Sequence, residues 1–166
     1  MQLQVMPAQG LCLPTSFAMA LDMPVESLLS QLRGWHDVIF PGLPEPLCWR
    51  GVHIQEVIRL ALNYGYAVTP CEMFPQIAPP RPGYENYVVT TESDDNQCAF
   101  GDVILLSRGV VTGLRGVPMT GMVGHAAAYD HGFLYDPNGY EYAFGLEACE
   151  EQSFFPQCAW RVDRIY

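Results

Sequence analysis

Basic residues, paired-cysteine motifs and long apolar runs are scarce or missing in this chain. Among its 166 residues, 8 Lys and Arg face 18 Asp and Glu, which gives a formal net charge of −10. Nucleic acids and anionic membranes are bound through clustered Lys and Arg, so this balance disfavours both classes of partner. We expect no nucleic-acid and no membrane partner, whereas a basic protein partner stays open.

The first residues also lack the features of a secretory signal. Residues 1–7 have no basic start and no continuous apolar core, and no apolar run in the chain approaches transmembrane length. We therefore expect a cytoplasmic protein, or one that acts inside a host cell.

The six cysteines contain no Cys-x-x-Cys pair. In a cytoplasmic setting such cysteines are typically free thiols rather than a disulfide framework. The spacing of His125 and His131 on an expected hairpin gives little support to a structural zinc site. We expect neither a metal nor a cofactor.

The chain is rich enough in apolar residues to fold as one domain. Apolar residues make up 49% and aromatic residues 12%, enough for a core in a single domain over residues 1–166. Apolar spacing predicts helices over 12–21, from an Asp22 cap to Gly34, and from Val52 to Tyr64 with Gly65 as the stop. This helical part covers about residues 1–65.

Residues 66–166 carry the strand signals. We expect strands at 66–69, 87–90, 103–106 and 110–111, then at the histidine segment, 133–135, 140–142 and 158–162. Four prolines between 74 and 83 suggest a crossover. The glycine-rich stretch 113–124 suggests a flexible loop that overhangs a substrate groove. The predicted fold class is α+β, an N-terminal helical lobe packed against a C-terminal antiparallel sheet.

Three residues carry the candidate chemistry. Cys12 lies two residues after Gly10, at the start of the first expected helix, where the helix dipole lowers the pKa of a thiol. His125 begins an apolar strand with three alanines after it, and Asp136 ends the next strand, so a hairpin can bring the two together. A thiolate attacks, an imidazole moves the proton, and a carboxylate orients the ring.

Each of these residues also has a structural interpretation. Most free cysteines are small buried hydrophobic residues, and the sequence 136–139, Asp-Pro-Asn-Gly, is an ordinary turn signal. Asn138 is the next candidate to orient His125, and Asp130 a weaker one. The combination of all three residue types in this order favours a thiol hydrolase.

In the order Cys12, His125, Asp136 the chain resembles the papain-like cysteine peptidase superfamily, above all its compact bacterial and phage members such as bacteriocin-processing peptidase domains. The resemblance covers the whole chain loosely. It implies a papain-like fold with the active site between the two parts, a peptide or isopeptide substrate, and hydrolysis without a cofactor.

One position departs from this pattern. The superfamily usually carries an oxyanion-hole glutamine six residues before the cysteine, where this chain has Met6. Gln9 is our choice for that role, together with the Cys12 backbone N–H, and Gln4 is the alternative. The run 10–13 also resembles ovarian-tumour-type deubiquitinases, in which backbone amides build much of the oxyanion hole.

Two other functions stay open. A transglutaminase-like acyltransferase has a similar Cys-His-Asp order and passes the acyl group to an amine instead of water. A papain-like binding or effector module without catalysis is the other, and the Met6 departure supports it most.

Overall fold

The computed structural model describes residues 1–32, 52–73, 103–119 and 121–165. Its helices are α1 (Cys12–Ala20), α2 (Val25–Gln31), α3 (Ile54–Asn63) and α5 (Leu146–Glu151). Its strands are β1 (Tyr66–Met73), β2 (Arg108–Val117), β3 (Gly121–Asp130), β4 (Phe133–Asp136), β5 (Tyr140–Ala143) and β6 (Phe154–Arg164). The expected strand at 87–90 and the proline-rich stretch 74–83 lie outside the described residues.

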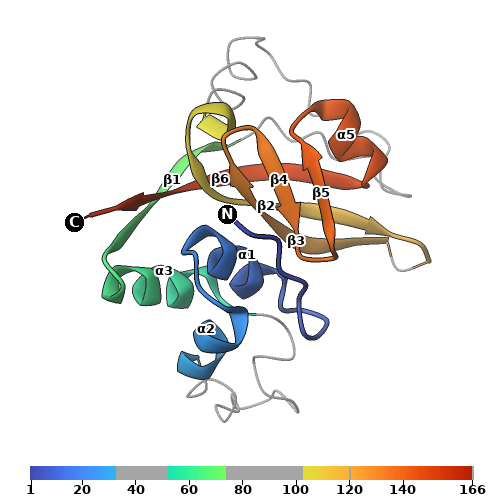
Figure 1. The fold of residues 1–166 in the computed structure, drawn as a ribbon. Coiled ribbons are helices and arrows are strands. Elements are labelled where there is room, and N and C mark those ends of the chain that lie inside the picture. Colours follow the sequence, from blue (N-terminus) through green and yellow to red (C-terminus); the bar gives the residue numbers. More distant parts are fainter. Residues whose placement is uncertain (33–51, 74–102, 120, 166) are drawn as a thin grey trace.

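The strands form one six-stranded sheet in the order β1-β6-β2-β3-β4-β5. Every neighbouring pair is antiparallel. Helices α1, α2 and α3 lie on one side of this sheet and α5 lies on the other (Figure 1). The predicted α+β class, with N-terminal helices packed against an antiparallel sheet, is confirmed.

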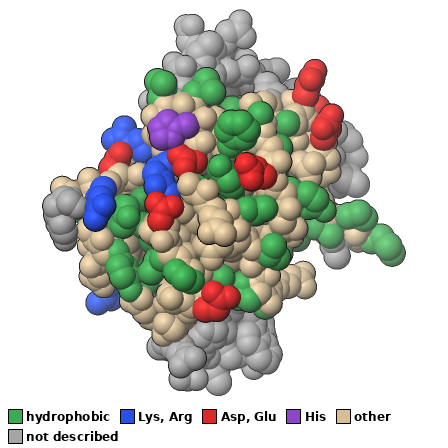
Figure 2. Space-filling model, viewed as in Figure 1, with side chains coloured by type: hydrophobic (Ala, Val, Ile, Leu, Met, Phe, Trp, Pro, Cys, Tyr) green, Lys and Arg blue, Asp and Glu red, His purple; other side chains and the backbone are tan. Residues whose placement is uncertain are grey.

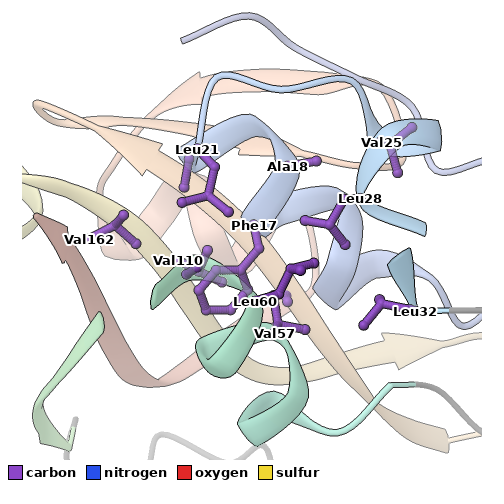
Figure 3. Close-up of a cluster of buried hydrophobic side chains, with 13 residues drawn as sticks. Phe17, Ala18, Leu21, Val25, Leu28, Leu32, Val57, Leu60, Val110 and Val162 are labelled. Atoms are coloured by element: carbon purple, nitrogen blue, oxygen red, sulfur yellow. The ribbon is translucent and has the colours of Figure 1, made fainter. Parts of the chain in front are cut away.

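Both faces of the sheet are buried, each in its own core. Val110 packs with Phe17 and the helices α1–α3, as Figure 3 shows. Ala126 belongs to the same cluster. Their chain neighbours Val111 and Ala127 belong to a second cluster on the opposite face. This division follows from the alternation of side chains along a strand, and it explains the apolar runs 110–111 of β2 and 126–129 of β3.

Helix α1 agrees closely with the predicted helix. Pro14 lies in its first turn, where a missing N–H costs no hydrogen bond. The remainder of α1 is buried, with Phe17, Ala18 and Ala20 fully inaccessible. It packs mainly on β3, so the helix that begins at Cys12 lies against the strand that carries His125.

The predicted start of the second helix is wrong. Asp22 is not its cap: the N-cap is Pro24 and the helix begins at Val25. The side chain of Gln4 takes over the capping role, because its Oε1 accepts a hydrogen bond from the Val25 N–H at 2.8 Å. Asp22 instead has a positive φ of 51° and forms an ion pair with Arg108.

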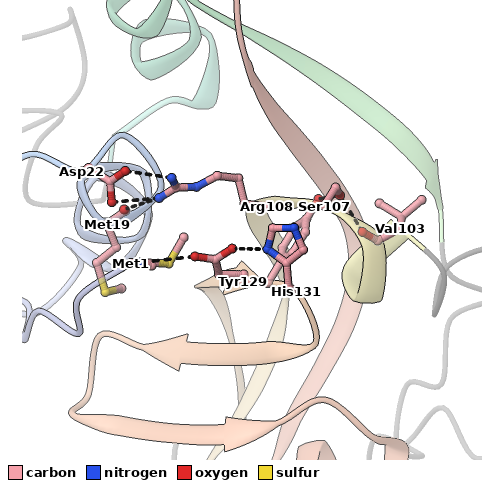
Figure 4. Close-up of polar contacts among 9 residues, drawn as sticks. Met1, Met19, Asp22, Val103, Ser107, Arg108, Tyr129 and His131 are labelled. Carbon is pink, nitrogen blue, oxygen red and sulfur yellow. Dashed lines mark hydrogen bonds and ion pairs between the residues drawn. The ribbon is translucent and has the colours of Figure 1, made fainter.

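This ion pair belongs to a polar cluster that joins the end of α1 to the start of β2 (Figure 4). Arg108 donates to both Asp22 oxygens, at 2.7 and 2.9 Å. Nearby, Asp130 accepts hydrogen bonds from the Met1 ammonium at 3.2 Å and from His131 Nδ1 at 2.6 Å.

Helix α3 and strand β1 follow the predicted positions. Gly65 adopts a φ of 79° just after the helix, a conformation that favours glycine. Strand β1 starts at Tyr66 as expected and continues to Met73.

The predicted loop at 113–124 is instead a β-hairpin. Strands β2 and β3 stay paired from Arg108 with Asp130 out to Val117 with Gly121. The hairpin projects from the sheet (Figure 1), and hydrophobic side chains cover this projection in Figure 2. Gly113 is there for packing rather than flexibility, because an added Cβ would lie 2.1 Å from the Phe155 carbonyl oxygen of β6.

Two helical segments were not predicted. Residues 103–106 form a helical turn rather than a strand. Ser107 ends this turn by donating from its N–H and its hydroxyl to the Val103 carbonyl. Helix α5 is too short for its periodicity to be recognised, yet it buries Cys149 in the second core cluster.

Candidate active site

Cys12 is the first residue of α1. No side chain in the described part of the protein caps the helix: its N-cap is Leu11, and Gly10 before it has a φ of 85°. The first N–H groups of a helix lack intrahelical partners and favour negative charge nearby. The thiol therefore lies where a thiolate is stabilised.

The surroundings of Cys12 lower the pKa of its thiol. Burial raises this pKa. Hydrogen bonding to His125, the charge of His125, and the backbone N–H groups of Ala126 and Leu13 lower it by more than burial raises it. The net effect is a pKa below the usual value of a cysteine.

Other described cysteines behave in the opposite way. Burial raises the pKa of Cys149 to about 11 and also raises the pKa of Cys158. Cys48 and Cys98 lie outside the described residues. Cys12 therefore differs from Cys149 and Cys158 in the direction of its pKa shift.

His125 and Asp136 are brought together by neighbouring strands. A short turn at 131–132 joins β3 to β4, and Ala128 pairs with Tyr135. His125 Nε2 lies 2.8 Å from Asp136 Oδ2, and the two residues are 7% and 0% exposed. Because a carboxylate only accepts, Nε2 carries the proton and donates.

His125 lies in the middle of β3, not at its start as predicted. Its ring forms a T-shaped contact with the ring of Phe154, with the two centroids 5.3 Å apart. Burial lowers its pKa, whereas the hydrogen bonds and charges of Asp136 and Cys12 raise it more, so the net pKa is raised. The imidazolium is therefore favoured in this site.

Asp136 is fully buried and well supplied with donors. Its Oδ1 accepts from the Asn138 backbone N–H at 2.8 Å and from Asn138 Nδ2 at 2.7 Å. Arg115 Nη1 lies 3.4 Å from Oδ1 and 3.3 Å from Oδ2. Burial raises the pKa of this carboxyl, but the hydrogen bonds and charge of His125 and the donors of Asn138 outweigh it, so the pKa is lowered.

The two alternative orienting residues lie differently. Asn138 Nδ2 is 3.5 Å from His125 Nε2, but its short hydrogen bond goes to Asp136. Asn138 thus supports the carboxylate. Asp130 forms its ion pairs with the Met1 ammonium and His131, and it does not bond to His125 in the structure.

Of the two candidate glutamines, Gln4 is held away from Cys12. Besides accepting from Val25, its Nε2 donates to the Met23 carbonyl at 2.8 Å. These partners follow the C-terminal end of α1, about 12 Å of helix length from its first residue. Gln9 is exposed in the turn just before Cys12, and the position of Met6 is fixed by its N–H donating to the Pro137 carbonyl at 2.8 Å.

Sequence reasoning missed Arg115. It lies in the glycine-rich stretch that was interpreted as a loop, and only the β2–β3 register places it beside the Asp136 carboxylate. An isolated basic residue in an acidic chain was the available signal.

Within the described ranges, no group of three or more His, Cys, Asp and Glu side chains could hold a metal ion. No helix in the same ranges has both the length and the apolar character needed to cross a membrane. Comparisons with protein-family models, with curated proteins and with solved structures found no match.

Proposed function

We propose that the protein is a cysteine peptidase or isopeptidase with a papain-like arrangement, in which Cys12, His125 and Asp136 act as a triad. One observation carries the proposal: His125 forms a buried hydrogen bond to Asp136 at 2.8 Å. The direction of the Cys12 thiol pKa, which interactions with His125 lower, supports it. A thiol with a depressed pKa beside an oriented imidazole is the arrangement that nucleophilic catalysis requires.

In the proposed reaction, the Cys12 thiolate attacks the carbonyl carbon of a peptide-type bond. The His125 imidazolium gives its proton to the leaving nitrogen, and a thioester remains on Cys12. His125 then takes a proton from water, which attacks the thioester and releases the acid. Asp136 holds the ring in the required tautomer and stabilises its charged form.

The negative oxygen formed at each attack needs hydrogen-bond donors. We assign this role to the Cys12 backbone N–H, at the uncapped start of α1, and to the exposed carboxamide of Gln9. We do not assign this role to Gln4, because both ends of its carboxamide bind the segment between α1 and α2.

The test is covalent labelling by a peptide-based probe with a thiol-reactive end, followed by mapping of the modified residue. The expected product is an adduct on Cys12 in the wild type and none in Cys12→Ala or His125→Ala. Cys149→Ala is the matched control, since Cys149 is buried with a raised pKa, and it should leave the labelling of Cys12 intact.

Labelling of Cys12 that is unaffected by His125→Ala would contradict the triad. The absence of any peptide-probe adduct would favour the binding module. For a labelled enzyme, mass analysis of the products of a cleaved peptide with and without an added amine separates hydrolysis from acyl transfer.

A further inference from the structure

Arg115 reaches the candidate site from β2. Its Nη1 makes both contacts to the Asp136 carboxylate, at 3.3 and 3.4 Å. The Arg115 side chain is 20% exposed, whereas that of Asp136 is fully buried. Within the described residues, Arg115 is the one Arg or Lys that forms an ion pair with this carboxylate.

The sheet register explains this contact. Gly113 of β2 pairs with His125 of β3, and Arg115 pairs with Val123. Residues two apart on a strand face the same side of the sheet, so Arg115 extends from the side on which His125 lies. Gly113, directly opposite His125, has no side chain to separate the guanidinium from the His125–Asp136 pair.

A buried carboxylate beside an imidazole and a thiol is a coupled system of charges. The ionisable groups that interact with His125 are Cys12 of α1 and Asp136 of β4. Tyr142 of β5 interacts through charge with both Asp136 and Arg115. The Asn138 donors are neutral. Arg115 therefore supplies the one permanent positive charge identified beside this pair within the described residues.

We infer that Arg115 is a positioning residue whose charge balances Asp136, and so limits how strongly the carboxylate holds the proton on His125. The inference rests on the proposed function for its catalytic meaning, since the same proton must leave His125 in each cycle. An uncompensated Asp136 would keep the imidazole protonated to higher pH and would slow its return to the base form.

Replacing Arg115 by Gln removes the charge and keeps a polar side chain. Loss of a nearby positive charge favours the protonated imidazolium of His125 and disfavours the thiolate of Cys12. The pKa values of His125 and Cys12 should therefore both rise, by about half a unit to one unit at this separation and partial exposure. A merely structural role for Arg115 would lower stability without this shared upward shift.

Arg115→Lys is the rescue variant. Because one nitrogen makes both contacts, an ammonium group can take its place. Arg108→Gln is the matched control. Arg108 lies on the same strand, five residues before the Gly113 that pairs with His125, and it binds Asp22 through two short hydrogen bonds (Figure 4). It should reduce stability and leave the His125 titration unchanged.

The measurement is NMR titration of the histidine side chains in the full chain, with the His125 signal assigned through His125→Gln. We expect an upward shift of the His125 pKa in Arg115→Gln, return to the wild-type value in Arg115→Lys, and no change in Arg108→Gln. An unchanged or lowered pKa in Arg115→Gln, or a shift that Lys does not reverse, overturns the inference. If the Gln variant does not fold, Arg115→Met gives the same test while keeping the packing of the stem.

This titration needs no activity, so it separates the inference from the proposed function. If Cys12 proves unreactive in the wild type, the proposed function fails while the effect of Arg115 on His125 can still be measured. In an active enzyme, both limbs of the pH profile of kcat/KM should move upward in Arg115→Gln and return in Arg115→Lys.

Discussion

At the scale of single residues, the buried Asp136 carboxylate defines the candidate site. Its charge is matched by the Asn138 donors and by the neighbouring His125 and Arg115. Burying a charge without such partners is costly. The turn at residues 136–139 therefore stabilises the buried charge as well as reversing the chain, because the Asn138 N–H and carboxamide both bind the Asp136 carboxylate.

The ionisation of Asp136 should be visible in the stability of the fold. Its folded pKa is lowered below the usual 3.8, so its contribution is fully present above the unfolded pKa and is lost as pH falls through the folded one. We expect the free energy of unfolding to fall more steeply for the wild type than for Asp136→Asn between about pH 5 and pH 2. Urea unfolding across this range measures both slopes, and equal slopes would contradict the assignment.

The ionisation of His125 should change the free energy of unfolding with pH in the opposite direction. Its folded pKa is raised above 6.5, so its contribution is fully present below the unfolded pKa and is lost as pH rises through the folded one. In Asp136→Asn, loss of the carboxylate should lower the His125 pKa, which the same NMR titration of histidine side chains detects.

Substitution of the two glutamines before α1 should have different effects: Gln4→Ala should lower stability, and Gln9→Ala should lower turnover. Gln4→Ala removes two hydrogen bonds that hold the N-terminal segment to the start of α2, which costs about 1–2 kcal/mol and lowers the melting temperature by a few degrees, roughly 2–8 °C. Gln9→Ala removes an exposed side chain and should leave the melting temperature unchanged. If Gln9 serves the oxyanion, turnover falls about a hundredfold in this variant.

Thermal melts and steady-state kinetics on any cleaved peptide give both readouts. A large fall in turnover for Gln4→Ala alone would show that the chosen glutamine is wrong. No fall in turnover for either variant would mean that backbone N–H groups suffice.

At the scale of elements, the β2–β3 hairpin places Arg115 and His125. It depends on Gly113, where an added Cβ would lie 2.1 Å from a β6 carbonyl oxygen. Gly113→Ala should therefore force β2 and β6 apart and destabilise the protein by about 1–3 kcal/mol. Gly124→Ala is the matched control, because among the described residues no atom outside its chain neighbours lies within 4 Å of its Cβ position. Chemical unfolding of both variants checks this, and equal stabilities would contradict the packing role of Gly113.

The sequence predicted the elements whose patterns are local. Helices α1 and α3 are marked by apolar spacing, and α3 also by Gly65 after its end. The β3–β4 hairpin is marked by two apolar segments on either side of His131 and Gly132. The hairpin prediction also placed His125 near Asp136. The prediction of a loop at 113–124 was wrong. Gly113 allows the backbone of β6 to approach closely, and that contact comes from residues distant in sequence.

The same limit explains the remaining differences. Asp22 has the residue type of a helix cap, yet it pairs with Arg108 from β2, and Gln4 supplies the cap. Neither partner is marked by local spacing. Arg115 was missed for the same reason, since its contact with Asp136 exists only once β2, β3 and β4 are in register.

At the scale of the whole molecule, the helices before residue 65 and the sheet after it meet where Cys12 begins α1. The arrangement buries both faces of the sheet and leaves the start of α1 uncapped beside β3. The central claim of the proposed function is that this junction converts Cys12 into a nucleophile through His125.

The rate of Cys12 alkylation by iodoacetamide as a function of pH, compared between the wild type and His125→Ala, tests that claim most directly. Because His125 lowers the pKa of Cys12, the wild type should react with an inflection below the usual thiol pKa, about 8.5, and faster than the other five cysteines near pH 7. In His125→Ala the inflection should move upward. Coincident curves for the two proteins, or a protected Cys12 while Cys48 or Cys98 reacts, would contradict the account.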